Sequence, residues 1–205
     1  MRRNPISIRQ ALNFAWPAFK KRYRLFAAVL LTIFGAWAVL EIVVIAGQRF
    51  GILLWVAAHL AFLVFFAGVE VGFLRICLAI HDGEDPAFAD AFAHLALGPK
   101  FLAGQILYLL MVVVGLVLLV VPGVYLGVRY SLFGFFLAGG ETNLKSSFQQ
   151  SATLTNGATA DLLKFFVALL LFNLLGACLL GLGLFVTVPM SGLVTTAVYR
   201  QLRTG

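Results

Sequence analysis

The sequence predicts an all-α fold, a polytopic bundle of membrane-spanning helices that forms one integral membrane domain over residues 1–205. Three observations predict it. Hydrophobic residues make up 62% of the chain and charged residues 11%, and the mean hydropathy of +1.02 lies far above that of a soluble domain. Apolar residues fall in runs of about 20, the length that crosses a bilayer as a helix. A Pro-Gly pair between two such runs predicts a tight helical hairpin.

Six spans are expected, arranged as three hairpins, at residues 25–46, 51–75, 101–121, 123–138, 162–182 and 184–202. The first run is longer than the apolar core of a signal peptide, so we expect it to remain as a span. Span 2 can continue as helix to about residue 80 and protrude beyond the headgroups. If the last segment is too short to cross, the number falls to five.

A short interfacial amphipathic helix is expected before each hairpin. Asn4-Pro5 is typical of a helix start and opens the first, over residues 5–20. Its apolar face is formed at helical spacing by Ile8, Leu12, Ala15 and Phe19, and Trp16 is a natural anchor at headgroup level. The same start at Asp85-Pro86 opens the second, with an apolar face of Phe88, Ala91, Phe92 and Leu95. The third has an apolar face of Leu144, Phe148, Ala152 and Thr155.

The distribution of basic residues predicts the orientation. Of the fifteen Lys and Arg residues, thirteen flank the ends of spans on one side, Arg49 lies on the other, and Arg129 lies within a span. Basic loops stay in the cytoplasm, so both termini and all three interfacial helices are expected there. The recurring order of amphipathic helix, outward span, tight turn and inward span suggests a threefold repeat.

Basic residues near the N-terminus are expected to contact membrane lipids. The net charge is +7, and its bases cluster beside apolar segments, which argues against nucleic acid as the partner. Electrostatic attraction to anionic headgroups is worth about 1 kcal/mol for each base near the surface. The expected contacts are Arg9, Lys20, Lys21, Arg22 and Arg24.

Pro122 and Gly123 are the expected hairpin turn, and Arg129 follows within the next span. An arginine near the bilayer centre costs about 2.5–3.5 kcal/mol when it faces lipid, so its side chain should face other helices. Counted at 1.5 Å per residue, Glu41 and His59 lie at a similar depth. We therefore expect an intramembrane polar cluster of these three residues. A buried Glu41–Arg129 pair that fixes helix register is the simpler interpretation, and a substrate or proton pathway is the alternative.

The motifs of catalysis and of metal binding are missing from the sequence. It contains no helical metal motif, phosphate-binding glycine loop or nucleophile elbow. The two cysteines, Cys77 and Cys178, are expected near opposite faces of the bilayer, which excludes a disulfide or a shared metal site. We expect no enzymatic activity, no metal and no cofactor.

The run VPGVYLGVRYSL followed by LAGGETNLKSSFQQSATLTNG resembles the membrane domain attached to some bacterial glycerophosphoryl diester phosphodiesterases, and its stand-alone polytopic relatives. The shared pattern is a Pro-Gly turn, Arg129, an acidic residue at Glu141, a serine-rich helix and a final Gly157. The resemblance implies a six-span protein of the bacterial cytoplasmic membrane. The catalytic barrel of those enzymes is missing, so their activity is not implied.

Two functions are therefore weighed. The first is a non-enzymatic scaffold or accessory subunit, either of a larger membrane complex or in envelope and lipid homeostasis, with a homo-oligomer as an alternative assembly. The second is a transporter of a small solute or lipid, with a polar pathway near Arg129. A threefold repeat counts against the second, because common transporter folds consist of two related halves.

Overall fold

The computed structural model describes residues 6–46, 51–179 and 181–204 of the chain. Its elements are helices: α1 (Ile8–Ala46), α2 (Gly51–His81), the 3₁₀ helices η2 (Phe88–Ala91) and η3 (Leu95–Leu97), α3 (Gly98–Leu118), α4 (Val120–Tyr130), α5 (Phe133–Ala138), α6 (Leu144–Leu154), α7 (Thr159–Cys178) and α8 (Leu184–Thr204). No strand occurs in these three ranges. The all-α prediction is confirmed.

Five helical segments of the described chain are long and apolar enough to cross a membrane, as judged by length and composition. They are Ile8–Ile45, Gly51–His81, Phe88–Leu118, Val120–Ala138 and Thr159–Cys178. The sixth predicted span forms the helix α8, but it falls outside this group. Its sequence explains why, because threonines and a serine interrupt the apolar residues and Arg200 and Gln201 follow before its end.

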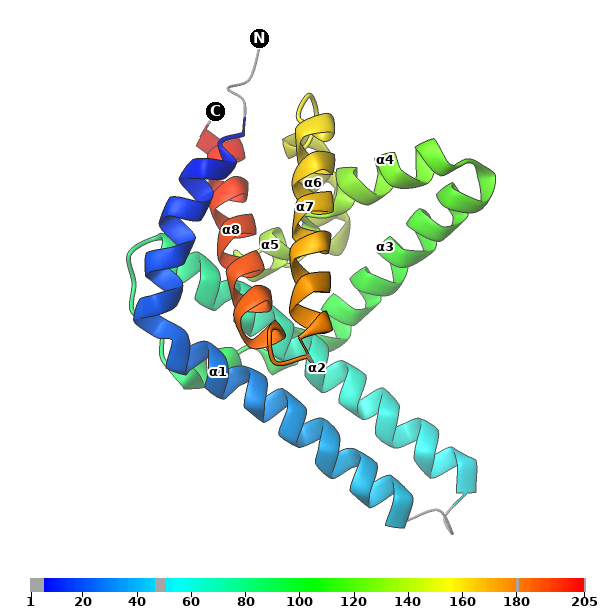
Figure 1. Cartoon of the computed structure of the whole chain (residues 1–205). Helices are drawn as coiled ribbons and strands as arrows, with labels where there is room; N and C mark the ends of the chain where they lie inside the picture. The colour runs from blue at the N-terminus through cyan, green and yellow to red at the C-terminus, as the bar shows by residue number, and fades with distance from the viewer. Residues whose placement is uncertain (1–5, 47–50, 180, 205) are drawn as a thin grey trace.

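α8 forms the centre of the helical body. It packs against α1, α2 and α7, and Figure 1 shows it between α1 and α7 with the two termini at the same end of the molecule. Leu193, Val194, Val198 and Tyr199 are all at most 2% exposed. The least apolar of the predicted spans is therefore the one that the protein itself surrounds.

α1 joins the first predicted interfacial helix and the first span into one helix that is kinked at Arg22 (φ −124°, ψ 23°). Its buried face is Ala11, Ala15 and Phe19, at positions i, i+4 and i+8. Ile8 and Leu12, the other two residues of the predicted apolar face, are exposed. Two alanines on the buried stripe allow α1 to pack closely against α8, and the Ser7 N–H donates to Gln201 Oε1 at 3.0 Å.

The second predicted interfacial helix is not an α-helix. Residues 88–97 form η2 and η3, two short 3₁₀ turns that pack against α2. The packing is so close that a Cβ built on Gly72 of α2 would lie 2.0 Å from the carbonyl oxygen of Ala91. The predicted apolar face is thus only partly buried, with Ala91 inside and Phe88 exposed.

The reversal between α3 and α4 occurs at Leu119, which has extended backbone angles (φ −161°, ψ 140°). The prediction that Pro122 and Gly123 form this turn is wrong, because both lie inside α4. Pro122 is the third residue of that helix, where a backbone N–H has no partner within the helix in any case. A Cβ on Gly123 would lie 2.4 Å from Leu116 N, so this glycine allows α3 and α4 to approach closely.

The predicted span 123–138 is divided into α4 and α5 by a turn at Ser131 and Leu132. The Leu132 N–H donates to Ser151 Oγ of α6 at 3.2 Å in place of a helical carbonyl. Every residue of α5 is buried. α6 forms where predicted and begins at Asn143, whose side-chain oxygen accepts from the Lys145 and Ser146 N–H groups.

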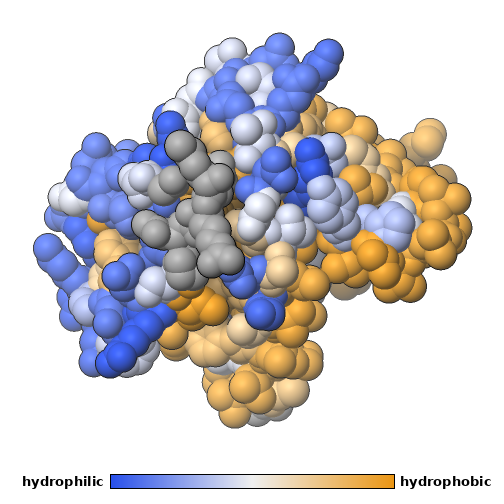
Figure 2. Space-filling view, turned by 90° about the horizontal axis from the view of Figure 1, so that it is seen from above, coloured by the Kyte–Doolittle hydropathy of each residue, from blue (hydrophilic) through white to orange (hydrophobic). Residues whose placement is uncertain are grey.

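Two pairs of helices extend beyond the helical body as apolar arms. In Figure 1 the arm formed by α1 and α2 and the arm formed by α3 and α4 project in different directions. Residues 30–45 and 51–66 of the first arm include no buried residue. Figure 2 shows that the surface on the side to which the arms project is hydrophobic, whereas hydrophilic residues gather over the end with the termini. Large exposed apolar residues of the arms include Leu31, Ile42, Leu53, Leu60, Leu109, Val117 and Val121.

Candidate functional site

The structure brings together two of the three residues predicted as an intramembrane cluster. His59 Nε2 lies 3.5 Å from Glu41 Oε1, between the outer parts of α2 and α1. The Nδ1 atom of His59 bonds to the Trp55 carbonyl oxygen at 2.9 Å, so it carries the proton and Nε2 faces the carboxyl group. Both side chains are about one-third exposed or less. This pair joins α1 to α2, whereas the register interpretation expected Glu41 to pair with Arg129.

Arg129 is the third member of that predicted cluster, and it lies in the other arm. Its Nη1 donates to the hydroxyl of Tyr125, and its guanidinium carbon lies 5.4 Å from the centroid of that ring. Its carbonyl oxygen accepts hydrogen bonds from Ser151 of α6 and from Thr155, the residue that follows α6, both at 3.0 Å. The last carbonyls of a helix have no partner within it, so these hydroxyls complete the end of α4. The residue therefore marks the junction of α4 with the polar helix α6.

The bases predicted to contact headgroups divide into two groups. Four are exposed on α1: Arg9, Lys20, Lys21 and Arg24. Arg22 instead pairs within the protein, which corrects its predicted role. Its side chain is 13% exposed, its Nη2 lies 2.8 Å from Asp85 Oδ1 and also donates to the Glu84 carbonyl oxygen. The ion pair holds the kink of α1 against the loop that follows α2.

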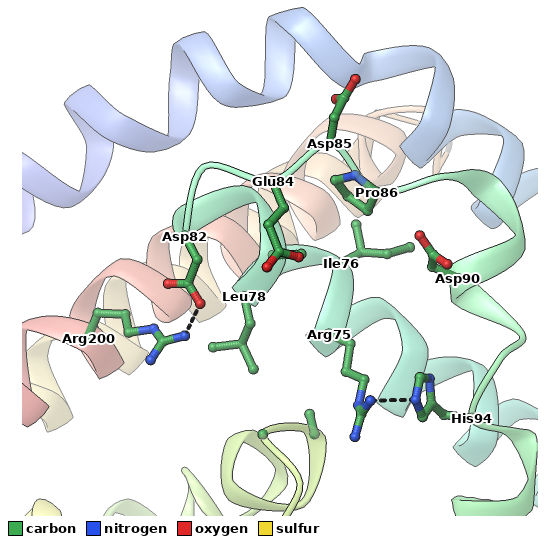
Figure 3. Close-up of a pocket in the computed structure, with 13 residues that line it drawn as sticks. Arg75, Ile76, Leu78, Asp82, Glu84, Asp85, Pro86, Asp90, His94 and Arg200 are labelled. Carbon is green, nitrogen blue, oxygen red and sulfur yellow. Dashed lines mark hydrogen bonds and ion pairs between the residues drawn. The ribbon is translucent and has the colours of Figure 1, made fainter.

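A charged cavity of about 470 Å³ lies between that loop, α2 and α8. Figure 3 shows two cations at its sides: Arg200 contacts Asp82, and Arg75 contacts His94. An arginine only donates, so His94 Nε2 must accept and its proton lies on Nδ1. Further carboxyl groups come from Glu84, Asp85 and Asp90, of which Asp85 also pairs with Arg22.

Three buried nitrogen atoms on this cavity, Arg75 Nε, His94 Nδ1 and Arg200 Nε, have no hydrogen-bond partner among the residues that the structure describes. Buried donors are satisfied by water or by a ligand when the protein does not satisfy them. With four carboxyl groups and two arginines on its walls, the cavity suits water and internal ion pairs better than an anion. The ion pairs Arg200–Asp82 and Arg22–Asp85 connect α8 and α1 to the loop after α2.

Sequence reasoning missed this cavity. Arg200 and Asp82 are 118 residues apart, and Arg22 and Asp85 are 63 apart, so no local spacing indicates either pair. Arg75 and His94 are 19 residues apart, and only the packing of residues 88–97 on α2 brings them together. The one local signal was the concentration of acids in residues 82–90, which is equally typical of a solvated loop.

Comparisons of the chain with protein-family models, with curated proteins and with solved structures find no match. The resemblance to the phosphodiesterase membrane domain therefore remains a prediction. Among the residues that the structure describes, no group of three or more His, Cys, Asp or Glu side chains is placed to hold a metal ion.

Proposed function

We propose that this chain is a non-enzymatic integral membrane protein of the bacterial cytoplasmic membrane, and that it acts as a scaffold or accessory subunit through lateral contacts in the bilayer. The observation that carries the proposal is the pair of apolar arms. Their exposed side chains cannot remain in water, because burying apolar surface is worth about 25 cal/mol per Å². Lipid chains or the helices of another protein must cover them.

The separation of polar from apolar groups supports lateral association. Hydrophilic residues gather over the end with the termini, whereas the large exposed side chains of the arms are apolar. The polar side chains described in the arms are paired within their own arm, Glu41 with His59 and Arg129 with Tyr125. A transporter would require a polar pathway through Glu41, His59 and Arg129. Arg129 is bonded to Tyr125 in the other arm, so we favour the accessory role.

The proposed topology has six spans in three hairpins, with both termini in the cytoplasm, and single cysteines test it. Leu119 and Leu182, at the proposed outer turns, are 68% and 70% exposed. We expect Leu119→Cys and Leu182→Cys to react with an impermeant thiol reagent added outside intact cells, in a background with Cys77→Ala and Cys178→Ser. Thr142→Cys is the matched control and should react only after permeabilisation. Labelling of the control alone in intact cells reverses the topology.

Photo-cross-linking in native membranes tests the role. Leu53 and Val117, at the ends of the two arms, are 82% and 81% exposed. We expect a photoreactive residue at each to give an adduct of one discrete mass with another protein. The same probe at Lys164, whose side chain is 79% exposed at the start of α7, should give no such adduct. The measurement is the adduct pattern on a denaturing gel, followed by mass spectrometry.

The result that overturns the accessory role combines two observations. One is an absence of protein adducts at both arm positions. The other is solute or lipid movement by the purified protein in liposomes, at a rate that Arg129→Ala abolishes. Together they would show that the protein acts alone as a transporter.

A further inference from the structure

A second cavity lies beside Arg129, in the angle between α3, α4 and α6. Its volume is about 920 Å³, and its walls include Leu107 and Met111 of α3, Arg129 of α4, and Lys145 and Phe148 of α6. We propose that this cavity is a specific binding site for an anionic phospholipid. The phosphate would lie between Arg129 and Lys145, and an acyl chain would lie along α3.

The two cations at this cavity are free to bind an anion. Among the described residues, neither Arg129 nor Lys145 forms an ion pair with a carboxyl group. The Arg129 guanidinium uses Nη1 for Tyr125, which fixes its plane and leaves Nε and Nη2 for a ligand. A planar guanidinium with two free N–H groups fits two oxygens of a phosphate, and a lysine adds a point charge.

The nearest acid in the sequence, Glu141, is already occupied. Its carboxylate accepts hydrogen bonds from the Asn143 N–H and the Ser146 hydroxyl, both at 3.0 Å, and from Gln150 Nε2 at 2.7 Å. These bonds, that of Asn143 first, hold the pKa of Glu141 below its ordinary value. Glu141 does not line the cavity, so it does not neutralise Lys145 there.

The apolar wall indicates a lipid rather than a small soluble anion. Leu107 and Met111 are four residues apart on α3, so they lie on one face of that helix. Phe148 and Ala152 have the same spacing on α6 and face the same space. An acyl chain along these side chains would bury apolar surface that water would otherwise contact, whereas inorganic phosphate gains nothing from it.

The charge of the walls selects the headgroup. The described residues that line this cavity include no carboxyl group, so the ammonium group of a zwitterionic lipid finds no counter-charge among them. The charged cavity near Arg200 has the opposite character, with four carboxyl groups on its walls. A headgroup of net negative charge, as in phosphatidylglycerol, therefore fits the site beside Arg129 better than phosphatidylcholine does.

Native mass spectrometry of the full chain in mild detergent measures this selectivity. We expect phosphatidylglycerol to bind with a lower Kd than phosphatidylcholine of the same acyl chains. Arg129→Gln and Lys145→Gln should each raise the phosphatidylglycerol Kd about fivefold, the effect of one base near the surface. Lys164→Gln is the matched control, because it removes an exposed base that does not line the cavity, and it should leave the preference intact. The double variant Lys20→Gln/Lys21→Gln tests the basic face of α1 separately.

Each alternative result has a definite meaning. Equal Kd values for the two lipids overturn the proposal, and so does loss of the preference only in the Lys20→Gln/Lys21→Gln variant, which would place the lipid on α1. Displacement of the lipid by millimolar glycerol phosphate would show that a small phosphate suffices and would overturn the lipid assignment. If Arg129→Gln lowers the unfolding temperature in the absence of lipid, its weaker lipid binding could come from a folding defect. The Lys145→Gln variant then tests the proposal by itself, because Lys145 is exposed and can be replaced without disturbing a packed helix.

Discussion

Gly72→Ala should destabilise the protein by about 3 kcal/mol or more, because the added methyl group has no space. A Cβ at this position would lie 2.0, 2.5 and 2.8 Å from the carbonyl oxygen, carbonyl carbon and Cα of Ala91. These are backbone atoms of η2, so no side-chain rotation relieves the overlap. The segment 88–97 would have to move away from α2, with loss of the Arg75–His94 contact. Thermal unfolding in detergent measures the effect.

Gly35→Ala is the matched control for this experiment. Gly35 is also within a long helix, but a Cβ there meets no atom within 4 Å. Alanine is favoured over glycine in a helix by about 1 kcal/mol, so this variant should be as stable as the natural protein or more stable. Equal stability of the Gly72 and Gly35 variants would show that residues 88–97 do not pack against α2 as described.

Tyr199→Ala should cost about 3–5 kcal/mol of stability, the range for removal of a large buried aromatic side chain. Tyr199 is 1% exposed at the centre of the body, and its ring stacks on Phe135 at 5.1 Å and meets Phe136 edge-on at 5.3 Å. Both phenylalanines belong to α5, so the cavity left by the substitution would loosen α5 from α8. Urea-dependent unfolding or thermal unfolding in detergent would measure the loss.

Two further variants separate the sources of this effect. Tyr199→Phe keeps the ring and removes only the hydroxyl group that accepts from Arg203 Nη1 at 3.2 Å, so its cost should be about 1 kcal/mol. Tyr23→Ala removes the same side chain from an exposed position of α1 and should have little effect. A large loss in the phenylalanine variant would mean that the hydroxyl group, rather than the packing of the ring, stabilises the junction of α5 with α8.

The helices could be predicted because hydrophobicity and helix-start residues act locally. α2 ends at His81, beyond the bilayer length, as its unbroken apolar run indicated. Asn143, a typical helix N-cap residue, and the polar, helix-compatible residues after it predicted the helix α6. Pro122-Gly123 shows the limit of local signals. Proline is compatible with a loop before a helix and also with the first helical turn. Only the close approach of Gly123 to Leu116 of α3 decides between these two positions.

The candidate sites depended on tertiary packing, which the sequence alone does not supply. Depth along a span placed Glu41, His59 and Arg129 together, but depth contains no information about which helices are neighbours. The arms diverge, so only the two residues of the same arm meet. The break between α4 and α5 was also hidden, because it depends on Ser151 of another helix accepting from the Leu132 N–H.

The divergence of the arms has a consequence for how mutations combine. Residues 30–45 and 51–66 have no buried side chain, and Leu53 and Val117, at the ends of the two arms, are 82% and 81% exposed. Energetic coupling between two sites requires shared partners, and distant sites without them have additive effects. Substitutions at Leu53 and Val117, on opposite arms, should therefore act independently of one another. Each arm can then adapt its surface to what covers it without a cost to the helical body or to the other arm.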